Sequence, residues 1–213
     1  MSTKKTIYYW APFLVPIATP KAVVNSAISM QKYSSFFNCF IINFFGEFDT
    51  FKKDLEKENV SLCHSPFRWL YKYLPSQGKI QSRFSYLVIF IFSFLFFKNL
   101  IKNAKPDFVI IHLITSLPLI LNLIFKLNSK FILRISGLPR LGFFRKILWK
   151  IALKKVCIVT CPTQTTLDSL KKLNIVDDNK LRLLYDPVIN IKKIKTTKNL
   201  NKEKIDLNFE YFF

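Results

Sequence analysis

Glycine is scarce in this sequence, with four residues among 213. No Gly-x-Gly-x-x-Gly motif follows the first expected strand, Thr6–Trp10, where such a motif brings backbone amides close to the phosphates of a dinucleotide. The segment after this strand, from Val15 to Lys21, contains no glycine at all. The sequence therefore lacks the motif that most readily marks a dinucleotide-binding domain.

Acidic residues are also few, and this sets the charge of the protein. There are 13 Asp and Glu residues against 33 Lys and Arg residues, giving a formal net charge of +20 and a pI near 9.9. Such a balance favours anionic partners, namely nucleic acid, phosphorylated ligands or the inner face of a membrane. Neither zinc-finger spacing nor an RNA-binding signature with interleaved aromatics is present, so nucleic acid is not expected as a partner. Aromatic and aliphatic stretches beside the basic residues favour a membrane surface.

The residue patterns of common catalytic and metal sites are sparse too. No pair of carboxylates is spaced for general acid/base catalysis, and no nucleophile elbow occurs. The four cysteines fit no metal-binding framework, so we expect no metal site. A chain of this size needs no disulfides for its core. We therefore expect reduced, mostly buried thiols in the cytoplasm at Cys39, Cys63, Cys157 and Cys161.

Two apolar stretches raise the question of a membrane span. Phe84–Phe97 is nearly all apolar, but its 14 residues are fewer than the roughly 20 that a spanning helix needs. Phe108–Phe125 is longer, but polar residues interrupt it, which favours a strand, a turn and a buried helix. Lys79, Arg83 and Lys98 flank the first stretch, so two interpretations stay open. It packs as a core helix against a sheet, or it lies partly in the membrane interface.

Strand-like and helix-like segments alternate along nearly the whole sequence. The expected strands are short apolar runs, typical of a sheet covered on both faces: Thr6–Trp10, Asn38–Phe44, Val60–Cys63, Asp107–His112, Lys130–Ile135, Val156–Thr160 and Leu181–Leu184. Helices are expected between them at Lys21–Tyr33, Phe51–Glu58, Ile80–Lys102, Leu117–Leu127, Gly142–Lys154 and Gln164–Leu173. This alternation predicts an α/β fold with a doubly wound, mostly parallel Rossmann-like sheet.

The candidate ligand site follows from this fold class. Ligands of an open parallel sheet bind beyond the carboxyl ends of its strands, so the residues directly after each expected strand are the candidates. Gly46 and Glu47 follow the second strand. The residues that we expect to bind substrate are polar, small or positively charged: Thr19, Lys21, His112, Ser116, Arg134, Ser136, Gly137, Arg140 and Thr163. Together they predict a cleft for a hydroxylated or phosphorylated ligand.

Four segments in order resemble the family-4 glycosyltransferases. Lys105–His112 is similar to the Lys-Pro-Asp strand of that family, which ends in histidine. Leu133–Gly137 and Val156–Thr163 resemble the next two strands. Lys180–Pro187 resembles the strand that closes the N-terminal domain, with Asp-Pro in place of the usual Asn-Gly. The resemblance covers nearly all of residues 5–190.

The resemblance implies a GT-B architecture of two Rossmann-like domains, of which this chain supplies the N-terminal, acceptor-side one. Residues 1–190 would form that domain, 191–205 a lysine-rich linker, and 206–213 the start of a missing C-terminal donor-binding domain. The basic residue and paired glutamates that hold the nucleotide-sugar lie in that second domain, so the chain alone is expected to be inactive. The implied reaction is metal-independent and retaining, with the nucleotide-sugar as co-substrate and no further cofactor. Two features depart from the family: the glycine-free loop before Lys21, and Ser136 where a histidine often stands.

Most candidate residues also have a structural interpretation. His112 is the best candidate for a catalytic role, through a hydrogen bond to a sugar hydroxyl, or it is a satisfied histidine at a buried strand end. Arg134 and Arg140 clamp a phosphate, as on a polyprenyl-phosphate-linked acceptor, or flank a turn at the surface. Lys21 helps to bind an anion at a helix N-terminus or is simply solvated. Thr163 is expected at a helix N-cap.

Three functions are compatible with these observations. The first is a glycosyltransferase of surface polysaccharide or lipid-linked glycan synthesis, cytoplasmic and peripheral on the inner face of the cell membrane. The second is a non-catalytic partner subunit that binds acceptor or membrane and docks on a separate donor-binding chain. The third, a Rossmann-like domain for an unrelated nucleotide, is weakened by the absent glycine motif.

Overall fold

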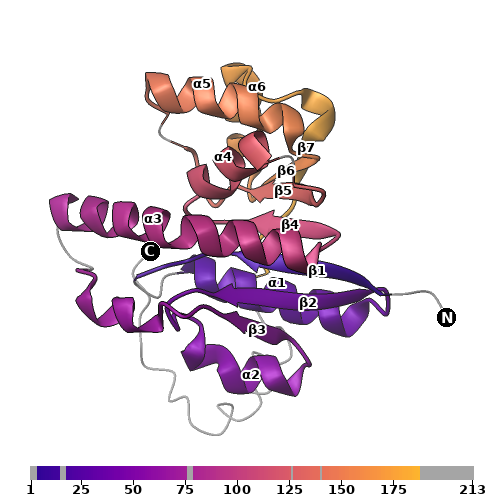
Figure 1. Ribbon diagram of the computed structural model, residues 1–213. Coiled ribbons are helices and arrows are strands. Elements are labelled where there is room, and N and C mark those ends of the chain that lie inside the picture. Colours follow the sequence, from indigo (N-terminus) through magenta and orange to yellow (C-terminus); the bar gives the residue numbers. More distant parts are fainter. Residues whose placement is uncertain (1–3, 15–17, 76–78, 126, 140, 188–213) are drawn as a thin grey trace, which may run out of the picture.

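A single parallel sheet organises the molecule, with helices on both faces (Figure 1). The structure, a computed structural model, describes residues 4–14, 18–75, 79–125, 127–139 and 141–187. Its seven strands are arranged in the order β3-β2-β1-β4-β5-β6-β7, and every neighbouring pair is parallel. The strands are β1 Lys5–Trp10, β2 Phe37–Asn43, β3 Ser61–His64, β4 Phe108–Ile111, β5 Lys130–Arg134, β6 Ile158–Cys161 and β7 Leu181–Leu183.

The helices divide between the two faces of this sheet according to the direction in which the chain travels. From β1 to β3 the chain moves outward through α1 (Ala18–Tyr33) and α2 (Lys52–Lys57). The long helix α3 (Lys79–Ala104) then returns it to β4 beside β1, and α4 (Ser116–Phe125), α5 (Phe143–Ala152) and α6 (Gln164–Leu173) follow. Parallel connections are right-handed, so reversing the direction moves the helices to the other face.

Alternation along β1 shows the two core layers that result. Tyr8 and Trp10 belong to the cluster that packs against α3, α4, α5 and α6. Ile7 and Tyr9 point the other way, into the cluster formed with α1 and α2. Successive side chains of a strand face opposite sides of a sheet, and both sides here are covered. The doubly wound Rossmann-like fold predicted from the sequence is confirmed.

The seven expected strands and six expected helices all form, with shifts of a few residues at their ends. Thr163 caps α6 as expected, because its side chain accepts a hydrogen bond from the Thr166 backbone N–H. The 3₁₀ segments η2 (Arg68–Tyr73) and η4 (Asp178–Lys180) were not predicted, and η2 is the longer of the two. Leu70 of η2 is buried with Phe44, Phe45 and Ile89 in a third, smaller cluster.

Helix α3 is longer than the uninterrupted apolar run inside it. Among the described residues it is the one helix whose length and composition would suffice to cross a membrane, over Arg83–Ala104, and 28% of its most apolar window is buried. Its C-terminal part, with Phe97 and Ile101, packs in the core, and its N-terminal part extends beyond the carboxyl ends of the strands (Figure 1). The core-packing interpretation of this stretch therefore holds for only part of the helix.

Some sequence expectations lie outside the described residues, namely the linker at 191–205, the segment 206–213 and Arg140. All four cysteines are free, with Cys39 and Cys161 buried and Cys63 and Cys157 half-buried. Within the described ranges no group of His, Cys, Asp and Glu residues is arranged to hold a metal ion.

Candidate functional site

The topological switch point of the sheet lies between β1 and β4. These strands are neighbours, with Trp10 opposite Ile111, but β1 leads to α1 on one face and β4 leads to α4 on the other. The backbone N–H of His112 extends the ladder by donating to the Trp10 carbonyl at 2.9 Å. Divergent connections at such a point leave a crevice at the carboxyl edge of the sheet, where α/β proteins bind their ligands.

The structure places the described candidate residues along this carboxyl edge. Thr19 and Lys21 lie in the first turn of α1, Ser116 begins α4, Arg134 ends β5, and Thr163 precedes α6. His112 and Arg134 are buried, and Thr19 and Ser116 are half-buried. Lys21, Ser136, Gly137 and Thr163 are exposed. These residues spread from β1 to β6, so they form an edge rather than one compact cluster.

His112 is the candidate with the most unusual surroundings. It is 4% exposed, and its Nε2 is a buried atom with no hydrogen-bond partner among the described residues. The Tyr9 ring lies beside the imidazole at a centroid distance of 6.3 Å. Burial, and to a lesser degree the positive charge of Arg134, lower the pKa of His112 to about 3. The imidazole is therefore neutral at pH 7, with one ring nitrogen able to donate and the other to accept a hydrogen bond.

Five other buried side-chain atoms of the described residues have no hydrogen-bond partner. Two of them, Ser129 Oγ and Trp149 Nε1, lie before β5 and in α5, away from this edge. Trp10 Nε1, Thr115 Oγ1 and Thr160 Oγ1 are buried and, within the described part of the chain, make no hydrogen bond. Trp10 ends β1, Thr115 follows β4, and Thr160 lies in β6. Buried polar groups nearly always have a partner, because leaving one without a hydrogen bond costs roughly 1–3 kcal/mol. His112 Nε2 and Thr115 Oγ1, both shortly after β4, therefore indicate a place where a polar ligand or water would complete the hydrogen bonding.

Arg134 has a partner inside the protein. Its guanidinium donates to Asp186 Oδ1 through Nε at 3.0 Å and Nη2 at 2.5 Å, and Nη2 also donates to the Tyr185 carbonyl at 3.0 Å. Asp186 follows β7 and Arg134 ends β5. This ion pair therefore holds the segment after β7 over the carboxyl ends of β5 and β6. A phosphate at Arg134 would have to compete with Asp186, and no local sequence pattern indicated this pairing.

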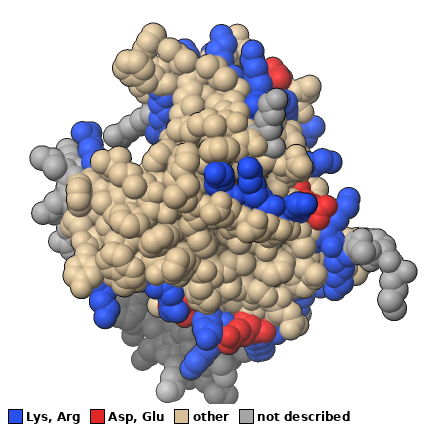
Figure 2. Space-filling model, in the orientation of Figure 1, with Lys and Arg blue, Asp and Glu red and all other residues tan. Residues whose placement is uncertain are grey.

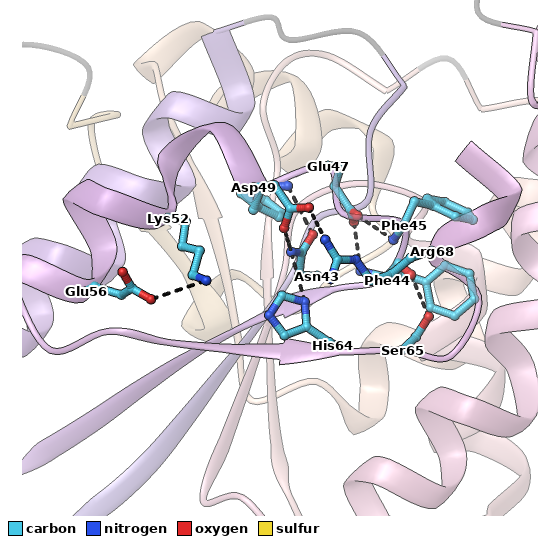
Figure 3. Close-up of polar contacts among 11 residues, drawn as sticks. Asn43, Phe44, Phe45, Glu47, Asp49, Lys52, Glu56, His64, Ser65 and Arg68 are labelled. Atoms are coloured by element: carbon cyan, nitrogen blue, oxygen red, sulfur yellow. Dashed lines mark hydrogen bonds and ion pairs between the residues drawn. The ribbon is translucent and has the colours of Figure 1, made fainter. Parts of the chain in front are cut away.

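A hydrogen-bonded network at the ends of β2 and β3 was also not predicted (Figure 3). Asn43, fully buried, donates from Nδ2 to Asp49 Oδ1 at 2.7 Å and contacts His64 Nδ1 at 3.3 Å. Its Oδ1 accepts from the Phe48 backbone N–H at 3.0 Å. Asp49 in turn forms a short ion pair with Arg68. The network links three segments that are distant in sequence, so its role is to hold the loop after β2 in place.

Glu47 lies inside this loop as a buried carboxyl group (Figure 3). Its oxygens accept hydrogen bonds from the backbone N–H groups of Phe44 at 3.2 Å and Phe45 at 2.6 Å. Burial raises the pKa of Glu47 to about 7, although these hydrogen bonds oppose the shift. The sequence placed Gly46 and Glu47 among the candidates after the second strand but did not indicate that Glu47 would be buried. Tertiary contacts make Glu47 a group that titrates near neutral pH.

Gly46 is required by the conformation of the same loop. Its φ is +89°, and a Cβ at this position would lie 2.8 Å from Asp49 Oδ2, which Arg68 and Asn43 hold in place. We expect Gly46→Ala to destabilise the protein by about 1–2 kcal/mol in urea unfolding, through backbone strain and the displaced carboxylate. Gly137→Ala is the matched control, because no atom lies within 4 Å of the added Cβ. Equal stability of the two variants would contradict the assigned strain.

Comparison with known proteins supports the fold. No protein-family model matches the sequence, and no curated protein is similar to it in sequence. Among solved structures, a glycosyltransferase from Rickettsia africae is 18% identical with a TM-score of 0.57, covering 96% of this chain and 51% of its own. UDP-GlcNAc 2-epimerase from Neisseria meningitidis bound to UDP-GlcNAc is 13% identical with a TM-score of 0.59, covering 98% and 56%.

A third structure, Medicago truncatula UGT71G1 complexed with UDP-glucose, is 11% identical with a TM-score of 0.58, covering 89% of this chain and 53% of its own. The chain thus spans about half the length of the structures that it matches. Identities this low carry information about the fold alone. Glycosyltransferases and an epimerase match equally well, so the narrower resemblance to family-4 enzymes stays a prediction. The chain has the α/β Rossmann-like fold of one half of a GT-B protein.

Proposed function

We propose that this chain forms the acceptor-side half of a glycosyltransferase that moves a sugar from a nucleotide-sugar to an acceptor hydroxyl. The observation that carries the proposal is the buried His112 Nε2, which lies at the switch point and has no hydrogen-bond partner among the described residues. The similarity to half of GT-B proteins, including one complexed with UDP-glucose, supports a UDP-sugar donor held by a second domain. Surface polysaccharide or a lipid-linked glycan is the proposed product.

We assign to His112 the role of orienting the acceptor hydroxyl through a hydrogen bond, rather than that of a general base that accepts its proton. With a pKa of about 3, the imidazole is neutral but a weak base at pH 7. A sugar hydroxyl would supply the hydrogen-bond partner that Nε2 lacks. The hydroxyls of Ser116 and Thr115, which follow the same strand, would contact a neighbouring part of the sugar.

The test is binding of sugar acceptors by the complete chain. We expect saturation-transfer NMR to detect weak binding of methyl glycosides, and His112→Gln to reduce the affinity about tenfold, the effect of one lost hydrogen bond in a buried site. His64→Gln is the matched control, because the other histidine of the chain is bonded to Asn43 in a different loop. Sugar transfer from a UDP-sugar by the isolated chain would contradict the division between acceptor and donor halves.

The alternative proposal is a non-catalytic partner subunit that docks on a separate donor-binding chain. A chain that spans about half of its structural matches is compatible with this arrangement. Co-purification with a second Rossmann-like chain, and transferase activity only in the mixture, would favour the subunit. Transfer activity of a longer form of this same polypeptide would favour the first proposal.

A further inference from the structure

The N-terminal part of α3 exposes apolar side chains and buries polar ones, which is the reverse of the usual arrangement in a soluble protein. Phe84, Leu87, Ile91 and Leu95 form one stripe, and 56–61% of each is exposed. The small polar residues of the same segment, Ser85 and Ser93, are fully buried. Ser85 Oγ donates to the Pro75 carbonyl at 2.8 Å, and Ser93 Oγ donates to the Ile89 carbonyl. A helix at the surface of a soluble protein normally exposes polar residues. The exposed apolar stripe of α3 therefore indicates contact with an apolar environment.

Helix α5 extends this apolar surface. Phe143 and Phe144 are 75% and 85% exposed, and Ile147 and Ile151 face solvent on the same helix. Helix α4 lies between α3 and α5 and contacts both, so the three helices are neighbours on one face of the sheet (Figure 1). Figure 2 shows a broad area without charged residues over the N-terminal part of α3. We call the outward-facing apolar residues of these two helices the α3/α5 surface: Phe84, Leu87, Ile91, Leu95, Phe143, Phe144, Ile147 and Ile151.

The charges around the α3/α5 surface are all positive. Asp107 is the one acidic residue in the sequence between Glu58 and Asp168, so α3, α4 and α5 contain none. Basic residues flank the apolar stripe and line α5: Arg83, Lys98, Arg145, Lys146 and Lys150. On the opposite face of the sheet, by contrast, Lys32 and Lys52 pair with Glu58 and Glu56. An apolar surface bordered by unopposed positive charge complements an anionic lipid surface.

The strand pairing of the sheet determines whether α3 can cross a membrane or only lie on its surface. Helix α3 connects β3 to β4, and both strands belong to the same hydrogen-bonded sheet. A bilayer-spanning α3 would separate β1, β2 and β3 from the other strands, although β1 pairs directly with β4. Because α3 is long enough to span but both its ends are tied to one sheet, its exposed stripe can enter a bilayer only from the side.

We propose that the α3/α5 surface binds the surface of an anionic bilayer, with both helices parallel to the membrane plane. A second copy of the chain is a poorer occupant, because a symmetric contact would bring the basic residues of two copies together with no acidic partner on these helices. The proposal does not depend on the sugar-transfer proposal, although a membrane position would present the carboxyl edge of the sheet to a lipid-linked acceptor.

Trp69 provides a direct probe for this surface. Of the three tryptophans in the sequence, Trp10 and Trp149 are buried, whereas Trp69 is 55% exposed and its ring lies 6.5 Å from that of Phe92 on α3. We expect a blue shift of its emission, and quenching by brominated lipids, when the complete chain meets vesicles containing phosphatidylglycerol. Phosphatidylcholine vesicles should bind at least about tenfold more weakly, since several basic residues each add roughly 1 kcal/mol near an anionic surface.

Two sets of variants assign the binding to the α3/α5 surface. Combining Leu87→Ser, Ile91→Ser and Leu95→Ser should lower the partition coefficient at least about tenfold by removing apolar area. Tyr33→Ser with Phe36→Ser is the control on the other face, since these side chains, at the end of α1 and directly before β2, are 76% and 67% exposed. Circular dichroism verifies that each variant is folded.

Two results would overturn the proposal. One is vesicle binding by the serine variant equal to that of the unaltered chain. The other is absence of binding to phosphatidylglycerol vesicles, and a dimer that the serine substitutions dissociate, detected by light scattering, would then show that a second copy covers the surface. Neither result bears on acceptor binding at His112, so failure of this inference is distinguishable from failure of the transferase proposal.

Discussion

Replacing Asp186 by alanine is expected to lower the free energy of unfolding by about 3–5 kcal/mol, the usual cost of breaking a buried ion pair. Only 6% of the Arg134 side chain is exposed, and Asp186 is its anionic partner. Without Asp186, the guanidinium keeps its contacts with the Leu184 and Tyr185 carbonyls but loses the charge that balances it. Urea unfolding followed by far-UV circular dichroism measures the loss.

Asp177→Ala is the matched control for this experiment. Asp177 pairs with Lys180 at 3.7 Å shortly before β7, but 68% of its side chain is exposed. Ion pairs in water contribute about 0–1 kcal/mol, so the control should be almost as stable as the unaltered chain. A second variant, Arg134→Met with Asp186→Leu, should recover much of the lost stability, because it removes both charges. Equal stability of the Asp186 and Asp177 variants would show that the buried pair is unimportant.

The second large effect is a pair of opposing pH dependences that nearly cancel in the unaltered chain. Folding raises the pKa of Glu47 from 4.5 to about 7, so the folded state binds more protons and stability from this group is lost as pH rises. Folding lowers the pKa of His112 from 6.5 to about 3, so stability from this group is lost as pH falls below 6.5. Between about pH 5 and about pH 8, the titration of each group changes the free energy of unfolding by roughly 2 kcal/mol, and the two changes have opposite signs.

Single substitutions separate the two contributions. In Glu47→Gln we expect stability to increase by about 2 kcal/mol from about pH 5 to about pH 8, because only His112 then titrates in this way. In His112→Gln we expect a decrease of similar size over the same range. Chemical denaturation at several pH values measures both slopes, and the double variant should be nearly flat. Identical slopes in the two single variants would contradict the assigned shifts.

The membrane and acceptor proposals concern neighbouring parts of the molecule. The N-terminal part of α3 extends beyond the carboxyl ends of the strands, and the residues around His112 lie at that same edge (Figure 1). An acceptor carried by a lipid would therefore approach the switch point from the carboxyl edge of the sheet. Each proposal has its own test, so either can fail without the other.

Local sequence patterns predicted the architecture of this protein well. Short runs such as Phe108–Ile111 and Ile158–Cys161 are buried on both sides, and a continuous apolar run is what such a strand requires. Thr163 and Pro106 mark element ends through backbone chemistry that acts over a few residues. The position of His112 at a strand end followed from the same reasoning, because the parallel order of the strands fixes which edge carries the loops.

The sequence did not reveal which polar residues would meet. Asn43, His64 and Arg68 are separated along the chain and come together only because β2 pairs with β3 and η2 folds back against them. The buried position of Glu47 depends on the loop after β2, which the contacts of Asn43 and Arg68 hold closed. Arg134 and Asp186 likewise meet across the ends of three strands. These are long-range pairings, and no local pattern of residue types specifies the partner of a polar side chain.

Helix α3 shows most clearly which features the sequence determined and which features only the tertiary structure decided. The sequence by itself determined that Phe84–Phe97 would be an apolar helix, because no charged residue, glycine or proline breaks the run. Only the tertiary structure decided which of its faces is buried: two serines pack inward, while Leu87, Ile91 and their neighbours remain outside. A helix that is apolar all round has no amphipathic pattern to set its rotation, so packing against the sheet and η2 fixes which residues face outward.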